Sequence, residues 1–310
     1  MTSKTAYLFP GQGSQSVGMG LELANAYPAA RQLFEQADRQ LGFSLSELAW
    51  NGPEEELNDT INTQPALFVH SIASWKIYRD LKPAGDPDMI AGHSMGELSA
   101  LVAAGALPFE AGLALVRRRG ELMKMAGEQN PGGMAAILGL DIPTLDGICA
   151  QASTPEEIIQ VANDNCPGQC VISGASPALE RAMELAKEAG ARRVVPLTVS
   201  IAAHSPLMAA AQEKFTEAVL QAPITDPAVP VVGNVTAAPM TSADEIRSDL
   251  VAQLRSRVRW TETIEYMHRQ GIEAVVELGN GEVLSGLVKR IDRSLVRLHF
   301  GSPEDLSSVN

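Results

Sequence analysis

Residues 89–103 read MIAGHSMGELSALVA, and this stretch decides the fold class. Its first four residues are an apolar run typical of a buried strand, and Met95–Ala104 has the spacing of an apolar-faced helix. Gly92 and Gly96 stand two residues before and two after Ser94, which is the pattern of a nucleophile elbow. A sharp strand-to-helix turn needs small residues there and lifts the serine hydroxyl off the sheet. We therefore predict an α/β protein with Ser94 as its nucleophile.

Outward from this turn, strand-like and helix-like segments alternate along the chain. The run Thr5–Phe9 is the one clear strand before Met89, and further strands are expected at 229–233 and 275–278. Alternation of this kind indicates a mainly parallel sheet flanked by helices. Helices are predicted over residues 28–41, 64–81, 110–126, 206–221, 244–254 and 261–270, and after the turn at 279–281.

Residues 127–197 have a different pattern, strand-helix-strand-strand-helix-strand, which is that of a ferredoxin-like unit. The strands are expected at 134–138, 158–162, 169–173 and 193–197, and the helices at 142–152 and 177–189. Hinges are expected at 127–133 and 198–201. The prediction is a large α/β-hydrolase-like domain, residues 1–126 and 198–310, interrupted by a small ferredoxin-like βαββαβ domain, residues 127–197.

A serine nucleophile needs a base within hydrogen-bond reach, and histidine is the usual one. Of the five histidines, His204 lies in a loop between a strand and a helix start, where catalytic groups collect. His93 precedes the nucleophile on its strand, so its side chain should point away from the hydroxyl. His70 and His268 fall within predicted helices and are expected to be packing or surface residues. His204 is the predicted base, while His299 stays possible.

An ordinary α/β-hydrolase is not expected, because those enzymes place several strands before the elbow and continue in the order serine, acid, histidine. Here the serine follows about the second strand of the sheet.

Composition and charge restrict the remaining possibilities. The formal net charge of −13 disfavours nucleic acid and anionic membranes as partners, and no apolar run is long enough to span a bilayer. Cys149, Cys166 and Cys170 are too few for a disulfide framework and lack a second pair for zinc. We therefore expect a cytoplasmic protein without a metal. Four basic clusters could contact an acidic partner: 117–119, 192–193, Arg255/Arg257/Arg259 and Lys289/Arg290/Arg293.

Nine motifs extend over nearly the whole chain in one order: FPGQGSQ (9–15), TQPAL (63–67), GHSMGE (92–97), RRRG (117–120), NDNCPGQCVISG (163–174), VSIAAHS (199–205), VGNVTA (232–237), QLRSRVRW (253–260) and ELGNGEVLSGLVKRI (277–291). With these motifs the chain resembles the malonyl-coenzyme A:acyl carrier protein transacylases of bacterial fatty acid synthesis, a family that includes the acyltransferase domains of polyketide synthases.

The resemblance implies a role for each matching residue. Ser94 would carry the acyl group and His204 would be its general base. The backbone N–H groups of Gln12 and Met95 would form the oxyanion hole. Arg119 would pair with the free carboxylate of a malonyl group. The main-chain carbonyl of Gln253 would orient His204, and Gln64 would line the acyl pocket.

The implied reaction transfers a malonyl group from malonyl-coenzyme A to the phosphopantetheine thiol of an acyl carrier protein, without a bound cofactor. Three alternatives remain: a discrete acyltransferase that serves a polyketide synthase, a hydrolase that removes stalled acyl chains from carriers, and a non-catalytic carrier-binding module. One departure from the family concerns selectivity. Many malonyl-selective relatives have phenylalanine where this chain has Ala203, and the smaller side chain leaves room for a branched acyl group.

Overall fold

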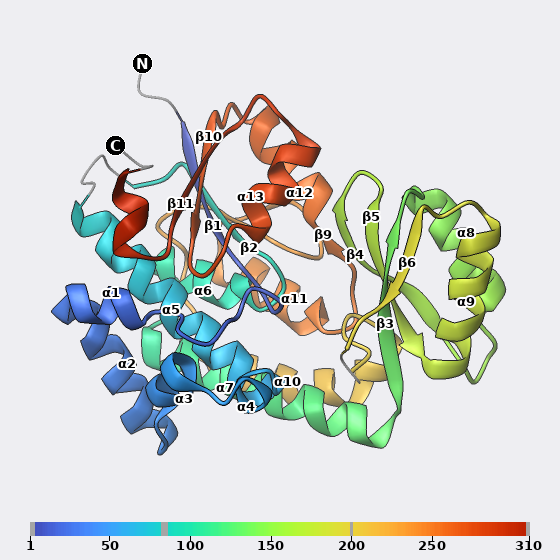
Figure 1. The fold of residues 1–310 in the computed structure, drawn as a ribbon, viewed down its shortest axis with the longest axis horizontal. Helices are drawn as coiled ribbons and strands as arrows, with labels where there is room; N and C mark the ends of the chain where they lie inside the picture. Colours follow the sequence, from blue (N-terminus) through green and yellow to red (C-terminus); the bar gives the residue numbers. More distant parts are fainter. Residues whose placement is uncertain (1–3, 82–85, 199–200, 308–310) are drawn as a thin grey trace.

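The computed structural model describes residues 4–81, 86–198 and 201–307, which build two sheets with helices packed on them (Figure 1). The larger sheet has six strands, in the order β11 (Val296–Phe300), β10 (Ala274–Leu278), β1 (Thr5–Phe9), β2 (Met89–Gly92), β7 (Val231–Val232) and β8 (Pro239–Met240). All neighbouring strands are parallel except β7 and β8. The predicted mainly parallel α/β sheet is therefore confirmed, and β2, which leads to Ser94, is the second strand in the chain.

Alternation along β1 explains why helices cover both faces of this sheet. Tyr7 and Phe9 face one apolar core, and Ala6 and Leu8 face another. The helices that contribute to the first core are α1 (Leu21–Ala26), α2 (Pro28–Leu41), α3 (Leu45–Asn51), α4 (Glu54–Leu57), α5 (Thr60–Leu81), α6 (Gly96–Ala103), α7 (Phe109–Gln129), α10 (Ala209–Gln221) and α11 (Ala243–Gln253). The second core is formed with α12 (Trp260–Arg269) and α13 (Val283–Ile291).

The smaller sheet lies at the other end of the molecule (Figure 1). Its strand order is β6 (Arg193–Pro196), β3 (Gly132–Leu138), β5 (Gln169–Ala175), β4 (Ile159–Cys166) and β9 (Val258–Arg259). Two helices, α8 (Ile142–Ala152) and α9 (Ser176–Glu188), pack on one of its faces. The chain order β3, α8, β4, β5, α9, β6 confirms the predicted alternation. The parallel partner β9 was not expected, because a two-residue strand has no periodic pattern.

Several boundaries differ from the expectation. Helix α7 continues to Gln129, so the first half of the hinge expected at 127–133 is helical. Helix α5 begins at Thr60, one turn earlier than expected, and contains Pro65. The same helix ends at Leu81, as predicted. Residues 82–85 after it, and residues 199–200 of the second hinge and of the VSIAAHS motif, lie outside the described residues. A 3₁₀ turn, η1 (Pro206–Met208), precedes α10, and a second, η2 (Pro303–Ser307), follows β11.

Three helices and one strand were not predicted from the sequence, for the same reason. Helices α1, α3 and α4 have only four to seven residues, too few for a repeating apolar face, and β8 has only two residues. The strand predicted at 229–233 is present as the shorter β7.

The three cysteines are free and buried, as expected of small packing thiols. In the described part of the chain, no helix has the length and hydropathy needed to cross a bilayer, and no cluster of ligand side chains could hold a metal ion.

Candidate active site

The turn from β2 to α6 has the strained geometry of a nucleophile elbow. Ser94 has φ 52°, in the left-handed region that side chains other than glycine rarely adopt. A methyl group on Gly92 would lie 2.0 Å from the backbone of Gly96, and one on Gly96 would lie 2.3 Å from the carbonyl oxygen of Phe9. The two glycines therefore allow β1, β2 and the start of α6 to approach closely.

Asn234 holds the backbone of the elbow from the loop after β7. Its Oδ1 accepts a hydrogen bond from the Ser94 N–H at 2.7 Å, and its Nδ2 donates to the Gly92 carbonyl at 2.8 Å. The motif VGNVTA was noticed in the sequence, but nothing in it showed that this amide reaches the nucleophile across 140 residues. The contact fixes the strained turn from outside.

The structure places His204, the predicted base, against the hydroxyl of Ser94. Its Nε2 is 2.7 Å from Ser94 Oγ, and its Nδ1 is 2.9 Å from the carbonyl oxygen of Gln253 and 3.1 Å from that of Ser256. Two carbonyls can only accept, so Nδ1 carries the proton and Nε2 offers its lone pair to the hydroxyl. Burial, and then the charge of Arg119, lower the pKa of His204 to about 3. The imidazole is therefore neutral and oriented as a base.

The loop that carries His204 is also held by the smaller sheet. Nε2 of Gln160, on β4, donates hydrogen bonds of 2.8 Å to the carbonyl oxygens of His204 and Arg255. His204 itself has φ 55°, a second strained position. Gln160 thus connects the loop of His204 to the turn at 253–256, whose two carbonyl groups hold the imidazole.

Arg119 lies in the interior next to the nucleophile, although it was also counted in a possible surface cluster. It is 1% exposed, and its Nη2 donates to Ser94 Oγ at 3.0 Å. Within the described chain its remaining contacts are with the neutral side chains of Gln64, Met123 and Gln253. Burial lowers its pKa to about 10, so the guanidinium keeps its charge at neutral pH. A buried cation with only neutral contacts is a place for an anion.

Gln253 connects the base and the arginine. Its carbonyl holds His204, while its Oε1 accepts from Arg119 Nε at 3.2 Å and Nη2 at 3.1 Å. Its Nε2 donates to the Ser94 carbonyl at 3.2 Å and to the carboxyl group of Glu97. Gln253 thus contacts His204 through its carbonyl, as expected. Its side chain also connects Arg119 to Glu97, which the motif did not indicate.

Glu97 and Asp249 form a buried acid pair behind Gln253. Glu97 is fully buried on α6, and Asp249 on α11 accepts from the N–H of Val235 at 3.2 Å. Burial, and then the charge of Asp249, raise the pKa of Glu97 well above its ordinary value. The proton therefore stays on Glu97, which donates to Asp249 and accepts from Gln253.

Gln64 contacts Arg119 directly, and Thr60 connects it to Gln12. Gln64 is fully buried, and its Oε1 accepts from Arg119 Nη1 at 2.9 Å. Gln12 is exposed in the loop after β1, with its side-chain oxygen bonded to Thr60 Oγ1 at 3.0 Å. Between described residues, no hydrogen bond occupies the backbone N–H of Gln12 or of Met95. Both donors are thus available to a bound oxygen atom.

Ala203 packs partly buried against Met134, Ala162 and Val171, on the face of the smaller sheet opposite its two helices. Ala203 precedes His204 in the chain and therefore lies close to Ser94, on the side of the smaller sheet.

The other histidines serve elsewhere. His93 Nε2 lies 2.8 Å from Asn165 Oδ1, and its ring packs on Trp260. His70 Nε2 contacts the carbonyl oxygen of Gly301, and His299 Nε2 that of Gly279, both at the far edge of the larger sheet. His268 is exposed on α12.

Together these groups can carry out acyl transfer on a serine. A neutral imidazole accepts the hydroxyl proton, two backbone N–H groups are available for an oxyanion, and a buried guanidinium can bind a carboxylate.

Comparison with known proteins agrees with this chemistry. The family model "Acyl transferase domain" matches residues 6–293. The malonyl CoA-acyl carrier protein transacylase of Bacillus subtilis is 47% identical over 305 residues, which cover 98% of this chain and 95% of that protein. The transacylase of the same name from Haemophilus influenzae is 45% identical over 307 residues, 99% of this chain and 97% of that protein.

Solved structures agree over the full length. An acyl carrier protein S-malonyltransferase from Vibrio cholerae superposes with a TM-score of 0.96 at 42% identity and covers 99% of this chain and all of its own. A malonyl-transacylase solved in complex with its type II PKS acyl-carrier protein gives 0.95 at 42% identity, over 99% of this chain and 98% of that one. The chain belongs to the acyl transferase family and, within it, to the malonyl CoA-acyl carrier protein transacylases.

Proposed function

We propose that this protein transfers a malonyl group from malonyl-coenzyme A to the phosphopantetheine thiol of an acyl carrier protein, through a malonyl ester on Ser94. The observation that carries the proposal is the position of Ser94 Oγ, 2.7 Å from His204 Nε2 and 3.0 Å from Arg119 Nη2. The hydroxyl can give its proton to the imidazole while the guanidinium stabilises the negative charge that develops on oxygen.

In the first half-reaction, Ser94 Oγ attacks the thioester carbonyl carbon as its proton passes to His204 Nε2. The carbonyl oxygen becomes an oxyanion bound by the N–H groups of Gln12 and Met95, and each such donor is worth on the order of 3 kcal/mol. Collapse of the intermediate breaks the carbon–sulfur bond, and the departing coenzyme A thiolate takes the proton back from the imidazolium.

The second half-reaction reverses these steps with a new thiol. His204 accepts the proton of the phosphopantetheine thiol, whose sulfur attacks the ester carbonyl carbon. The bond to Ser94 Oγ breaks, and the alkoxide recovers its proton from His204. Two carbonyls on Nδ1 keep the same tautomer ready in both directions.

Arg119 would select the malonyl group. Its fork matches the two oxygens of a carboxylate, and Gln64 and Gln253 hold the fork from both sides. The same buried charge opposes an editing hydrolase for plain acyl chains, because an uncharged chain would leave the cation without an anion. The small Ala203 would let a branched malonyl derivative enter.

We also propose the domain division that the sequence suggests. Residues 1–126 and 198–310 would form the α/β-hydrolase-like unit and residues 127–197 a ferredoxin-like insertion. The strand order β6-β3-β5-β4 supports the latter, since it is that of the antiparallel ferredoxin-like sheet. The proposed substrates would place the protein in the cytoplasm.

A second candidate is the same reaction in the service of a polyketide synthase. It is favoured by the similarity to the malonyl-transacylase solved with a type II PKS acyl-carrier protein. Transfer rates to purified carriers of the two pathways would separate the candidates, because the chemistry on Ser94 is shared.

The proposal is tested by incubating the protein with malonyl-coenzyme A alone and analysing its peptides by mass spectrometry. One malonyl group is expected on the Ser94 peptide, and it should leave when a holo-carrier is added. Ser94→Ala should remain unmodified. A malonyl group on another residue, or none on the wild type, would contradict the mechanism.

A further inference from the structure

The proposed roles of Arg119 and Gln12 leave unexplained a buried hydroxyl that lies between them. Thr60, the first residue of α5, is 4% exposed. Its Oγ1 is 3.0 Å from Gln12 Oε1 and 2.8 Å from Gln64 Nε2. One hydroxyl thus contacts both glutamines.

The direction of these hydrogen bonds is fixed by chemistry. Arg119 can only donate, so the atom of Gln64 that faces it is the oxygen, at 2.9 Å. The amide nitrogen of Gln64 must then point to Thr60 and donate to the hydroxyl oxygen. The hydroxyl proton is left to donate to Gln12 Oε1. The bonds run head to tail from Arg119 through Gln64 and Thr60 to Gln12, an arrangement in which each bond strengthens the next.

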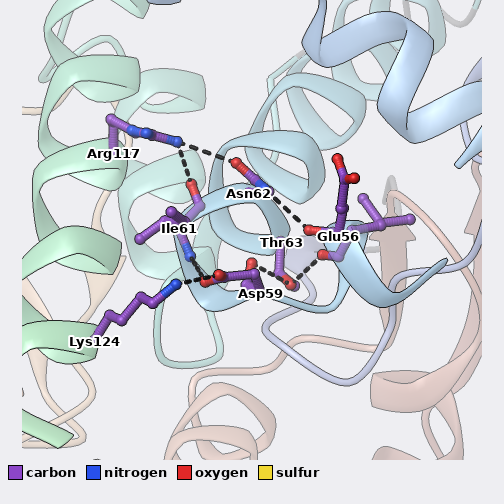
Figure 2. A network of polar contacts seen from close by, with 8 residues as sticks. Glu56, Asp59, Ile61, Asn62, Thr63, Arg117 and Lys124 are labelled. Carbon is purple, nitrogen blue, oxygen red and sulfur yellow. Dashed lines mark hydrogen bonds and ion pairs between the residues drawn. The ribbon is translucent and has the colours of Figure 1, made fainter. Parts of the chain in front are cut away.

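The first turn of α5 is fixed on α7, the helix that carries Arg119. Arg117 donates to the Ile61 carbonyl oxygen at 2.9 Å and to Asn62 Oδ1 at 3.2 Å, and Lys124 is paired with Asp59. Figure 2 shows how these residues connect the two helices. These two basic residues precede and follow Arg119 along α7 and hold the backbone on both sides of Thr60.

Close packing adds to these polar contacts. A methyl group on Gly120 would lie 2.9 Å from the Thr60 carbonyl oxygen and 3.0 Å from Ile61 Cα. The two helices therefore touch through backbone, one residue after Arg119, and the hydroxyl has little freedom to move.

We propose that Thr60 is a positioning residue that couples the carboxylate-binding guanidinium to the oxyanion loop. This inference rests on the proposed function. Through Gln64 the hydroxyl fixes the direction of the guanidinium fork, and through the side chain of Gln12 it fixes the loop whose N–H binds the oxyanion. Binding of a malonyl carboxylate to Arg119 would thereby stiffen the oxyanion loop as well.

The test compares Thr60→Val, which keeps the shape and removes the hydroxyl, with Thr60→Ser, which keeps the hydroxyl. Formation of the Ser94 adduct is timed with malonyl- and with acetyl-coenzyme A. Thr60→Val should slow malonyl transfer about 30-fold and acetyl transfer about fivefold. Malonyl transfer needs both Arg119 and Gln12, the two ends of the hydrogen-bonded series, whereas acetyl transfer needs only Gln12. Thr60→Ser should stay within about twofold of wild type for both donors.

Thr63→Val is the matched control. Thr63 is fully buried in the same turn of α5, and its hydroxyl donates to the carbonyl oxygens of Leu57 and Asp59, neither of which is a residue of the site. This change should lower the melting temperature and leave the malonyl-to-acetyl ratio unchanged. If Thr60→Val does not fold, Thr60→Ala removes the same hydroxyl with less bulk.

The outcomes separate the two proposals. A wild type that takes no malonyl group refutes the proposed function. If the wild type is acylated and Thr60→Val keeps the wild-type malonyl-to-acetyl ratio, whether its two rates stay normal or fall equally, the role of Thr60 is refuted.

Discussion

At the scale of single residues, Arg119 combines two conditions that rarely coexist, a full charge and nearly complete burial. Its hydrogen-bond partners within the described chain are all neutral, and Glu97, the acid whose charge would favour the guanidinium, keeps its own proton. A bound carboxylate would supply the missing charge, which makes the residue selective as well as costly.

Arg119→Ala should therefore reduce malonyl transfer about 100-fold and acetyl transfer by no more than about fivefold. A charge-assisted pair is worth ~3 kcal/mol, and ~1.4 kcal/mol corresponds to tenfold. The measurement is kcat/KM with both donors. Arg119→Lys is the control: it keeps the charge without the planar fork and should recover only part of the malonyl activity. Equal losses for the two donors would remove Arg119 as the carboxylate ligand.

The environment of His204 predicts an unusual dependence of rate on pH. Its pKa is lowered to about 3 by burial and by Arg119, so the base stays unprotonated well below 6.5. The acylation rate of the free enzyme should then show no loss centred near pH 6.5 and should persist to about pH 5, where circular dichroism confirms folding. An acid limb with its midpoint at 6.5 or above would show that the imidazole is solvated and that the site is open to water.

The sequence allowed the residues of the proposed reaction to be predicted, but not the residues that hold them in place. Ser94 and His204 follow from local patterns, a Gly-flanked serine and a histidine in a loop. Asn234, Glu97 and Thr60 also lie within or near recognised motifs, yet their roles depend on contacts with residues 48 to 156 positions away. Such pairings depend on the packing of whole helices, which no local pattern contains.

At the scale of elements, β4 reaches from the smaller sheet to the catalytic loop. The pattern of residues 127–197 predicted its strands, but gave no reason to expect that Gln160 bonds the carbonyls of His204 and Arg255 at 2.8 Å. This side chain holds together the base and the turn that orients it.

Gln160→Met keeps the length of the side chain and removes both donors. We expect kcat for malonyl transfer to fall about tenfold with KM nearly unchanged, because the loss of two hydrogen bonds of ~1 kcal/mol each is partly recovered by relaxation of the loop. Steady-state kinetics would measure it. Gln151→Met, an exposed change on α8, is the control and should behave as wild type. A change in KM alone would indicate that Gln160 contacts substrate instead.

At the scale of the whole molecule, the larger sheet, α6 and α11 converge on the buried acids Glu97 and Asp249. A group whose pKa is raised on folding stabilises the fold below its unfolded value, about 4.5 for glutamate, and this stabilisation is lost as pH rises through the folded value. The stability that the neutral Glu97 contributes therefore decreases as the pH rises above about 4.5.

Glu97→Gln is a permanently neutral replacement that can still donate to Asp249 and accept from Gln253. Its melting temperature relative to wild type, measured by thermal unfolding, should be higher at pH 8.5 than at pH 5. Glu245→Gln is the control, because capping hydrogen bonds lower the pKa of Glu245. Its carboxyl group is therefore largely ionised in both the folded and the unfolded protein throughout this pH range. That difference should be flat. A flat difference for Glu97→Gln as well would mean that Glu97 is ionised in the folded protein.

The short strand β9 follows directly after Gln253 and Ser256 and runs beside β4. The two carbonyls that hold the imidazole are therefore anchored to the same strand that carries Gln160. A rigid-body movement of the smaller sheet would therefore displace both the loop of His204 and the turn that holds its imidazole. A serine ester formed before such a movement would not react until the sheet returned. Hydrolysis would be suppressed in the interval without any lid, because His204, the proposed base, would have moved away from Ser94 with the sheet.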